Sequence, residues 1–284
     1  MRWRKVPKDE YYKAEAFLRK REKYCVTASA RFLKINESRG HVWYLGNPGG
    51  EINALLLHCG HSLFPVFDKN SSVPGPTFLS RFLGKVHIHA IQGLREDAEL
   101  LESLMQGQSY FAAERINYEL MSLDAPQLCC EASRPEKFNT DPAGLVLRSP
   151  KNEDTESLVA LQAAYEQEEV LPEHAVFNAA ASRVNLERIL MSERVLVAEI
   201  NGQVIGKINT SAESFSRYQI GGVYIRPDCR GHGIGTKMTA AFVQSLLSER
   251  KGITLFVKKR NAAAIAVYRK AGFRILADYR ISYY

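Results

Sequence analysis

The chain has 284 residues, 45% of them hydrophobic, and a formal net charge of +7. This length and this apolar content exceed what one ordinary domain requires and suit two hydrophobic cores. The basic residues are scattered among 31 acidic ones without a nucleic-acid-binding motif, so we expect no nucleic-acid partner. No stretch reaches the length of a membrane helix, and the five cysteines lack the spacing of a disulfide framework; we expect a cytoplasmic protein without a membrane partner.

The N-terminal half shows the pattern of a small α/β unit. A basic amphipathic helix is expected between Tyr11 and Phe32. Two β-rich runs, His41 to Leu45 and Ile52 to His58, flank the turn-forming segment Gly46 to Gly50 and predict a hairpin. A strand over Lys85 to Gln92 and a helix over Leu94 to Met105 follow.

Histidines in this half raise the question of a metal site. His58, His61, His87 and His89, with Cys59 nearby, are the candidate ligands, and alternation places His87 and His89 on one strand face. No carboxylate or cysteine completes a recognisable ligand spacing. We therefore expect no bound metal.

A polar segment broken by prolines, Arg134 to Pro142, predicts the boundary between two domains, residues 1–138 and 139–284. The second half begins with a strand at Gly144 to Arg148. Asn201-Gly202 is a strong hairpin signal. Its other expected elements are helices at Glu153 to Gln162 and Ala179 to Met191, and strands at Arg194 to Glu199 and Gln203 to Asn209.

A glycine-rich turn, Arg230 to Gly235, joins the run Ile220 to Ile225 to an amphipathic segment, Thr236 to Leu247. A strand that leads through such a turn into a helix leaves backbone N–H groups free at the positive end of the helix dipole. This arrangement holds phosphate or pyrophosphate groups. The turn alone is also compatible with an ordinary loop.

Further signals follow the turn in a fixed order. Ile253 to Val257 predicts a buried strand, Asn261 an N-cap, and Gly272 the end of an alanine-rich helix. Tyr268 lies two helical turns after Asn261, so both side chains can share one helix face.

Together these residues resemble the GNAT superfamily of N-acetyltransferases. The resemblance runs from about Gly144 to the C-terminus and rests on Val223, Pro227, the Arg230-x-x-Gly233-x-Gly235 motif, and the set formed by Asn261, Tyr268, Gly272 and Phe273. It implies an α/β fold, with a mostly antiparallel central sheet flanked by helices, and acetyl-CoA as the acyl donor. Tyr268 would protonate the departing thiolate. The implied cofactor-binding residues are Val223, Tyr224, Ile225, Arg230, Gly231, His232, Gly233, Ile234, Gly235, Thr236 and Asn261.

The base that would neutralise the acceptor amine is harder to identify. Gln219 stands near the position where some relatives carry a glutamate, and an amide accepts no proton at neutral pH. Glu213 is placed slightly ahead of Glu168, Glu169 and His174, and each of these is also compatible with a solvated or substrate-orienting role.

The order of hairpin, strand and helix in the first half repeats that of the second, which predicts tandem GNAT-like domains. We align the junction Gln92 to Asp97 with the glycine turn of the second half. This junction has one glycine and two acidic residues in place of the three glycines and the arginine. Carboxylates at a helix start repel a pyrophosphate. The first half is thus expected not to bind the cofactor, and to complete an acceptor cleft or form a subunit contact, as in a homodimer.

The function expected from the whole pattern is transfer of an acetyl group to the primary amine of a small molecule or peptide, by direct attack. The alternative is a non-catalytic protein that binds acyl-CoA or regulates another protein.

Overall fold

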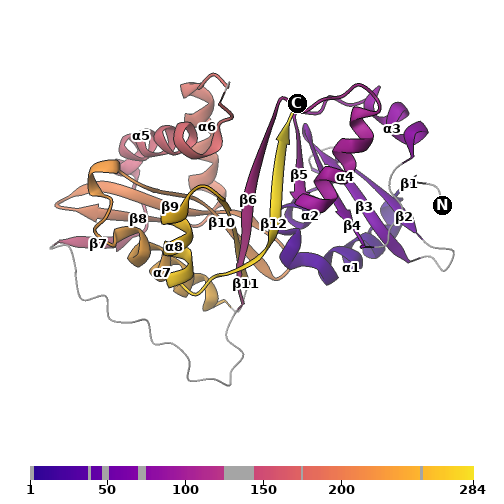
Figure 1. Ribbon diagram of the computed structural model, residues 1–284. Helices are drawn as coiled ribbons and strands as arrows, with labels where there is room; N and C mark the ends of the chain where they lie inside the picture. The colour runs from indigo at the N-terminus through magenta and orange to yellow at the C-terminus, as the bar shows by residue number, and fades with distance from the viewer. Residues whose placement is uncertain are drawn as a thin grey trace. The chain divides into compact units, whose positions relative to one another are not determined.

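The computed structural model describes residues 3–37, 40–46, 51–69, 75–124, 144–173, 175–249 and 252–284 (Figure 1). The chain divides into two compact units, unit 1 (Met1–Leu120 with Leu276–Tyr284) and unit 2 (Met121–Ile275). The expected boundary near residue 138 lies outside the described residues. Each unit is a sheet with helices against it, which confirms the predicted α/β class.

The sheet of unit 1 is antiparallel over its first four strands, and β4 then pairs with β5 in parallel. The last strand of the chain also belongs here, since Tyr279 to Tyr283 pair with Leu94 to Ala90 of β5 (Figure 1). The strands are β1 (Arg4–Lys5), β2 (His41–Gly46), β3 (Ile52–Cys59), β4 (Ser62–Phe67), β5 (Ala90–Leu94), β6 (Glu114–Leu123) and β12 (Arg274–Tyr283).

Helices cover unit 1 on two faces. Leu56 and Leu63 share a core with α3 and α4, whereas the alternate residues Leu55 and Leu57 are buried on the opposite side, where α1 and α2 contact β3. The helices are η1 (Lys8–Glu10), α1 (Tyr11–Arg21), η2 (Glu22–Tyr24), α2 (Val26–Leu33), α3 (Pro76–Leu83) and α4 (Arg95–Gln106).

Three predictions for unit 1 need correction. The single helix expected between Tyr11 and Phe32 is interrupted at Cys25, whose φ of −138° is not helical. The strand expected from Lys85 begins only at Ala90. Strand β4 and helix α3 were not predicted, because Pro65 within β4 argues against a central strand and α3 has only eight residues.

Unit 2 has the same kind of sheet. Strands β7 to β10 run antiparallel, and β10 pairs with β11 in parallel. The predicted hairpin is confirmed, with Asn201 and Gly202 at φ 51° and 79° between β8 and β9. The strands are β7 (Leu145–Arg148), β8 (Val195–Ile200), β9 (Gln203–Glu213), β10 (Arg217–Ile225) and β11 (Gly252–Lys258).

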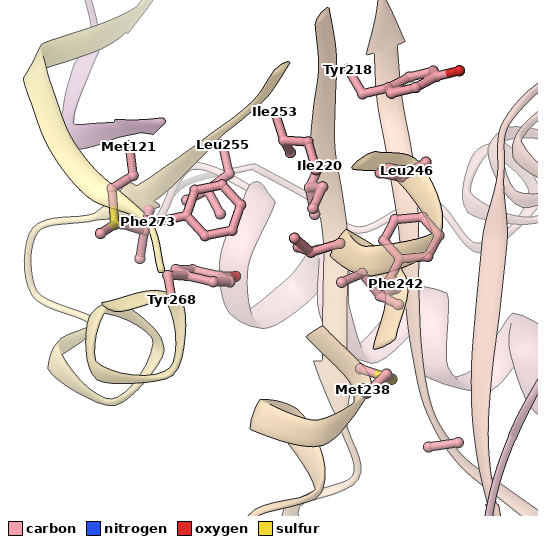
Figure 2. Close-up of a cluster of buried hydrophobic side chains, with 14 of the residues drawn as sticks. Met121, Tyr218, Ile220, Met238, Phe242, Leu246, Ile253, Leu255, Tyr268 and Phe273 are labelled. Atoms are coloured by element: carbon pink, nitrogen blue, oxygen red, sulfur yellow. The ribbon is translucent and has the colours of Figure 1, made fainter. Parts of the chain in front are cut away.

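The larger core of unit 2 lies between its sheet and helices α7 and α8, where Met238, Phe242 and Leu246 meet Ile220 and Leu255 (Figure 2). On the other face, α5 and α6 pack against Val197, Val204 and Tyr224. The helices are η3 (Asn152–Asp154), α5 (Thr155–Tyr165), the π-helical turn η4 (Glu166–Val170), α6 (Ala179–Ser192), η5 (Pro227–Cys229), α7 (Ile234–Leu247) and α8 (Ala262–Lys270).

Two further findings concern the described ranges only. None of their helices combines the length and the apolar character needed to cross a bilayer. None of their His, Cys, Asp and Glu side chains form a group of three that could hold a metal ion, although the rings of His61 and His89 lie 4.6 Å apart.

Candidate active site

Strands β10 and β11 are paired over only part of their length. The parallel ladder runs from Arg217 and Gly252 to Ile220 and Leu255, while β10 continues to Ile225 and β11 to Lys258. The ends beyond the ladder, residues 221–225 and 256–258, are called here the open strand ends. Because β10 keeps its pairing with β9 as far as Ile225, only its edge toward β11 offers backbone groups to a ligand.

The ladder between β9 and β10 is irregular where the open strand ends begin. Its register shifts between Gly221 and Tyr224, and Gly222 has a φ of +58°. The fully buried Lys207 of β9 donates hydrogen bonds from Nζ to the Gly222 carbonyl (3.1 Å) and to Asn209 Oδ1 (2.9 Å). A Cβ on residue 222 would lie 2.0 Å from Asn209 Oδ1, so this bulge requires glycine.

The environment of Lys207 is mostly apolar, and its ammonium lies 5.2 Å from the centre of the Tyr165 ring. Burial lowers the pKa of Lys207 to about 7, and the charge of Glu166 opposes this change. Lys207 was not among the site residues predicted from the sequence. The available signal was a lysine within the buried run Val204 to Ile208.

The glycine turn leads from η5 into α7. Gly231 and Gly233 have φ values of +83° and +75°, and Gly233 is the N-cap residue of α7. A glycine cap supplies no side-chain acceptor, so the first N–H groups of α7, at Ile234, Gly235 and Thr236, are left for another partner. The Asn178 side chain caps α6 and that of Asn261 caps α8, so α7 differs from its neighbours.

Arg230 joins the turn to β10 and to η4. Its Nε donates to the Ile225 carbonyl (2.9 Å), and its guanidinium lies 5.1 Å from the centre of the Tyr224 ring. Two further bonds of 2.8 Å pair Arg230 with both carboxylate oxygens of Glu168. This pairing lowers the pKa of Glu168, so the carboxylate stays ionised. His232 is exposed in the same turn.

The next residue of η4, Glu169, contacts the start of α8. Its carboxylate accepts a hydrogen bond from Asn261 Nδ2 (2.9 Å) and lies 3.9 Å from Lys258 Nζ. Asn261 Oδ1 accepts a bond from the Ala264 N–H, which confirms the predicted N-cap. The π-helical turn therefore connects both open strand ends through the carboxylates of Glu168 and Glu169.

Tyr268 is buried on α8 beside Phe273, with ring centres 6.1 Å apart (Figure 2). Burial, with smaller contributions from Tyr165 and Glu169, raises the pKa of Tyr268 above its ordinary value. The phenol thus stays protonated at neutral pH, as a proton donor must be.

The structure does not bring Glu213 to this group. Glu213 ends β9 and pairs with Tyr218, five residues along β10 from Val223, which is a separation of about 17 Å in an extended strand. This placement does not support Glu213 as the base. Gln219 bonds through Nε2 to Ser211 Oγ, and His174 lies outside the described residues.

Unit 1 contains a counterpart of this arrangement, at a position other than the one we aligned. The parallel pair with a helix between its strands is β4–α3–β5, so the glycine turn corresponds to the segment before α3. The junction Gln92 to Asp97 corresponds instead to the start of α8. The alignment was wrong because β4 and α3 were not predicted.

In unit 1 the parallel ladder also stops early, at Leu63 and Ile91, but the ends of β4 and β5 beyond it, called here the closed strand ends, lie against each other. A Cβ on Gly93 would lie 3.1 Å from the Pro65 carbonyl, and Asp97 of α4 accepts a hydrogen bond from the Phe67 N–H (3.2 Å). The cavity that Asp97 and Gly93 line has a volume of about 10 Å³. Burial raises the pKa of Asp97 to about 7.

The comparisons with known proteins agree with this geometry. Residues 156–273 match the Acetyltransferase (GNAT) family. The chain is 32% identical over 145 residues to a mycothiol acetyltransferase of Saccharomonospora viridis, an alignment that covers 46% of each protein, so the chain spans about half of that relative.

Solved structures resemble the chain over almost its whole length. A Drosophila protein covers 99% of it with a TM-score of 0.64 at 12% identity. A tandem GNAT protein from the clavulanic acid biosynthesis pathway also covers 99%, with a TM-score of 0.58 at 12% identity. The fold therefore resembles that of this tandem GNAT protein, and residues 156–273 match the GNAT acetyltransferase family.

Proposed function

We propose that unit 2 binds acetyl-CoA and transfers its acetyl group directly to a primary amine in a ternary complex. The observation that carries this proposal is that unit 2 combines three features suited to the cofactor. These are the free backbone edge of β10, the start of α7 without a side-chain cap, and the buried hydroxyl-bearing Tyr268. The match of residues 156–273 to the Acetyltransferase (GNAT) family supports it.

Each feature suits one part of the cofactor. The pyrophosphate accepts hydrogen bonds from the first N–H groups of α7, with Arg230 as a nearby cation. The pantetheine arm lies along Val223, Tyr224 and Ile225, where its amides replace the partners that β11 no longer supplies. Asn261 contacts the arm from the start of α8.

The bulge places one backbone N–H for the reaction. In a trans peptide the carbonyl and the N–H point in opposite directions, and Lys207 draws the Gly222 carbonyl to its own side. The Val223 N–H of the same peptide consequently points away from Lys207. There it polarises the thioester carbonyl and stabilises the negative charge that develops on its oxygen. Lys207 is a positioning residue in this account.

The bond changes follow from these positions. The neutral amine attacks the carbonyl carbon, a nitrogen–carbon bond forms, and the carbon–sulfur bond breaks. Tyr268 gives its hydroxyl proton to the leaving thiolate. The carboxylate of Glu169, held by Asn261 and in electrostatic contact with Tyr268, takes the proton that the amine loses.

We also propose that unit 1 binds no acetyl-CoA at the ends of β4 and β5, since Asp97 occupies the N–H at the end of β4. Carboxylates, among them Asp68, Glu96 and Glu99, also line the cavity of about 710 Å³ beside these ends. The acceptor for unit 2 is a small molecule or a peptide that carries a primary amine.

The test uses the full-length chain, acetyl-CoA and a panel of primary amines, with release of free coenzyme A thiol as the readout. We expect thiol release that depends on the amine and saturates with it. If acetyl-CoA binds with a measurable Kd and no amine in the panel is acetylated, the non-catalytic alternative replaces this proposal.

A further inference from the structure

Unit 1 also contains a hollow that lies away from its closed strand ends. A cavity of about 590 Å³ lies among residues of β1, β2 and α3, and no residue of unit 2 lines it. Sites for small organic ligands have volumes of roughly 300 to 1,000 Å³. The hollow, called here the tryptophan pocket, is thus large enough for one such molecule.

Aromatic side chains form much of its wall. Trp3 stacks on Phe78 with ring centres 5.7 Å apart, and Trp43 meets Phe82 edge to face at 4.8 Å. Trp3 and Phe82 are buried in the core of unit 1, whereas Trp43 and Phe78 are only partly buried. The two partly buried rings offer apolar surface on which a flat ligand can stack.

The remaining lining is positively charged. Lys5, Arg81 and Lys85 are exposed at the pocket, and none of them forms an ion pair within the described ranges. No carboxylate of those ranges lines the pocket. The pKa of His41 is lowered mainly by burial and, to a smaller extent, by the positive charge of Lys5. By contrast, Arg21 and Arg95 of the same unit are paired with Asp68 and Glu99. Three cations without a counter-ion attract an anion.

The pocket also has an unsatisfied donor. Trp3 is 7% exposed, and its indole Nε1 has no hydrogen-bond partner in the described part of the chain. A buried N–H without a partner carries a free-energy cost, which an acceptor atom on a ligand would remove.

We propose that the tryptophan pocket binds a planar aromatic ring that carries a negatively charged group. The ring stacks on Trp43 and Phe78, and the charged group lies among Lys5, Arg81 and Lys85. Both nucleoside phosphates and aromatic carboxylates have this chemistry. The site is separate from acetyl transfer and does not depend on the function proposed for unit 2.

Intrinsic fluorescence offers a direct test, because the only two tryptophans of the chain, Trp3 and Trp43, both line this pocket. The full-length chain is titrated with adenosine monophosphate, nicotinate, uncharged adenosine and inorganic phosphate, with calorimetry in parallel. We expect a saturable change with at least one of the two charged ring compounds, and at least tenfold weaker binding of adenosine and of phosphate. Binding of adenosine monophosphate would identify the ligand class as nucleoside phosphates, and binding of nicotinate as aromatic carboxylates.

Variants locate the binding site. Arg81→Gln with Lys85→Gln should weaken binding at least tenfold, and the matched pair Arg31→Gln with Lys34→Gln, exposed in the same unit away from the pocket, should leave the Kd unchanged. Thermal unfolding checks that each variant is folded. The proposal would be overturned if neither charged compound gave a fluorescence change or heat of binding. Equal losses of affinity in the two double variants would also overturn it.

Discussion

The segments β4–α3–β5 and β10–α7–β11 have the same topology, and only the second has the features of a cofactor site. β3 and β4 pair without a register shift, and Pro76, which has no N–H, opens α3 after a glycine with negative φ. In unit 2, a bulge, two left-handed glycines and a helix start rich in free donors take their place. We infer from this comparison that the shared topology supplies a position for a cofactor, and that a few backbone details of unit 2 make it the proposed site.

The largest expected effect comes from removing the proton donor. Tyr268→Phe should lower kcat by about 10²- to 10⁴-fold, the usual range for a general acid, and leave the Kd for acetyl-CoA almost unchanged. Steady-state kinetics and calorimetry give the two values. The control is Tyr218→Phe, which removes another buried hydroxyl of unit 2, one bonded to Glu249 outside the site. Similar kcat losses in both variants would remove the catalytic role of Tyr268.

A smaller loss is expected when the bulge loses its support. Lys207→Met keeps the length of the side chain and removes the bond to the Gly222 carbonyl. We expect kcat to fall about 10- to 100-fold with little change in the acetyl-CoA Kd, since one oriented N–H at the developing charge contributes on that scale or above. The control is Lys270→Met, which changes an exposed lysine of α8. A variant that weakens cofactor binding as much as kcat would show a merely structural role.

Removing the Glu168 carboxylate, which competes with the pyrophosphate for Arg230, should strengthen acetyl-CoA binding rather than weaken function. Glu168→Gln frees Arg230 from its two-bond ion pair, so acetyl-CoA should bind about three- to tenfold more tightly at low salt. Glu156→Gln is a close match, because Glu156 forms the same two-bond pair with Arg183, away from the site. Unchanged or weaker binding by Glu168→Gln would mean that the pair instead holds the site together.

The smallest effect concerns the closed strand ends of unit 1. The pKa of Asp97 is raised to about 7 by burial, against 3.8 ordinarily, so the native state keeps a proton that the unfolded chain loses. Stability should fall as pH rises from about 4 to 7, and Asp97→Asn should remove that part of the fall. Melting temperatures at pH 4.5 and 8 should differ by a few degrees less in the variant than in the wild type. Equal pH dependence would contradict the assigned proton.

Much of unit 2 could be predicted, because its signals are local. Asn201-Gly202, the Asn261 cap and the glycine turn each specify a backbone conformation within a few residues, and the structure has those elements there. Lys207 could not be found in this way, and Glu169 was only one of four candidates for the base. Their importance comes from contacts with residues distant in the sequence, Gly222 and Asn261, and a charged residue in a sequence is ordinarily solvated.

The errors in unit 1 have the same physical origin. Pro65 lies inside β4 beyond the ladder with β5, which ends at Leu63, so its missing N–H breaks no bond there; no local pattern reveals this. Without β4 and α3, the acidic junction at Gln92 to Asp97 was compared with the wrong part of unit 2. Asp97 nevertheless lies at the closed strand ends, through its bond to the Phe67 N–H.

The central claim is that acetyl-CoA binds at the glycine turn of unit 2 and not at its counterpart in unit 1. Two matched substitutions test it, because a Cβ has open space at both Gly233 and Gly75 but only Gly233 has a positive φ. Calorimetric titration of the full-length chain should give one acetyl-CoA site per chain, with a Kd weakened at least tenfold by Gly233→Ala and unchanged by Gly75→Ala. Two sites per chain, or a loss of affinity with Gly75→Ala alone, would contradict the account.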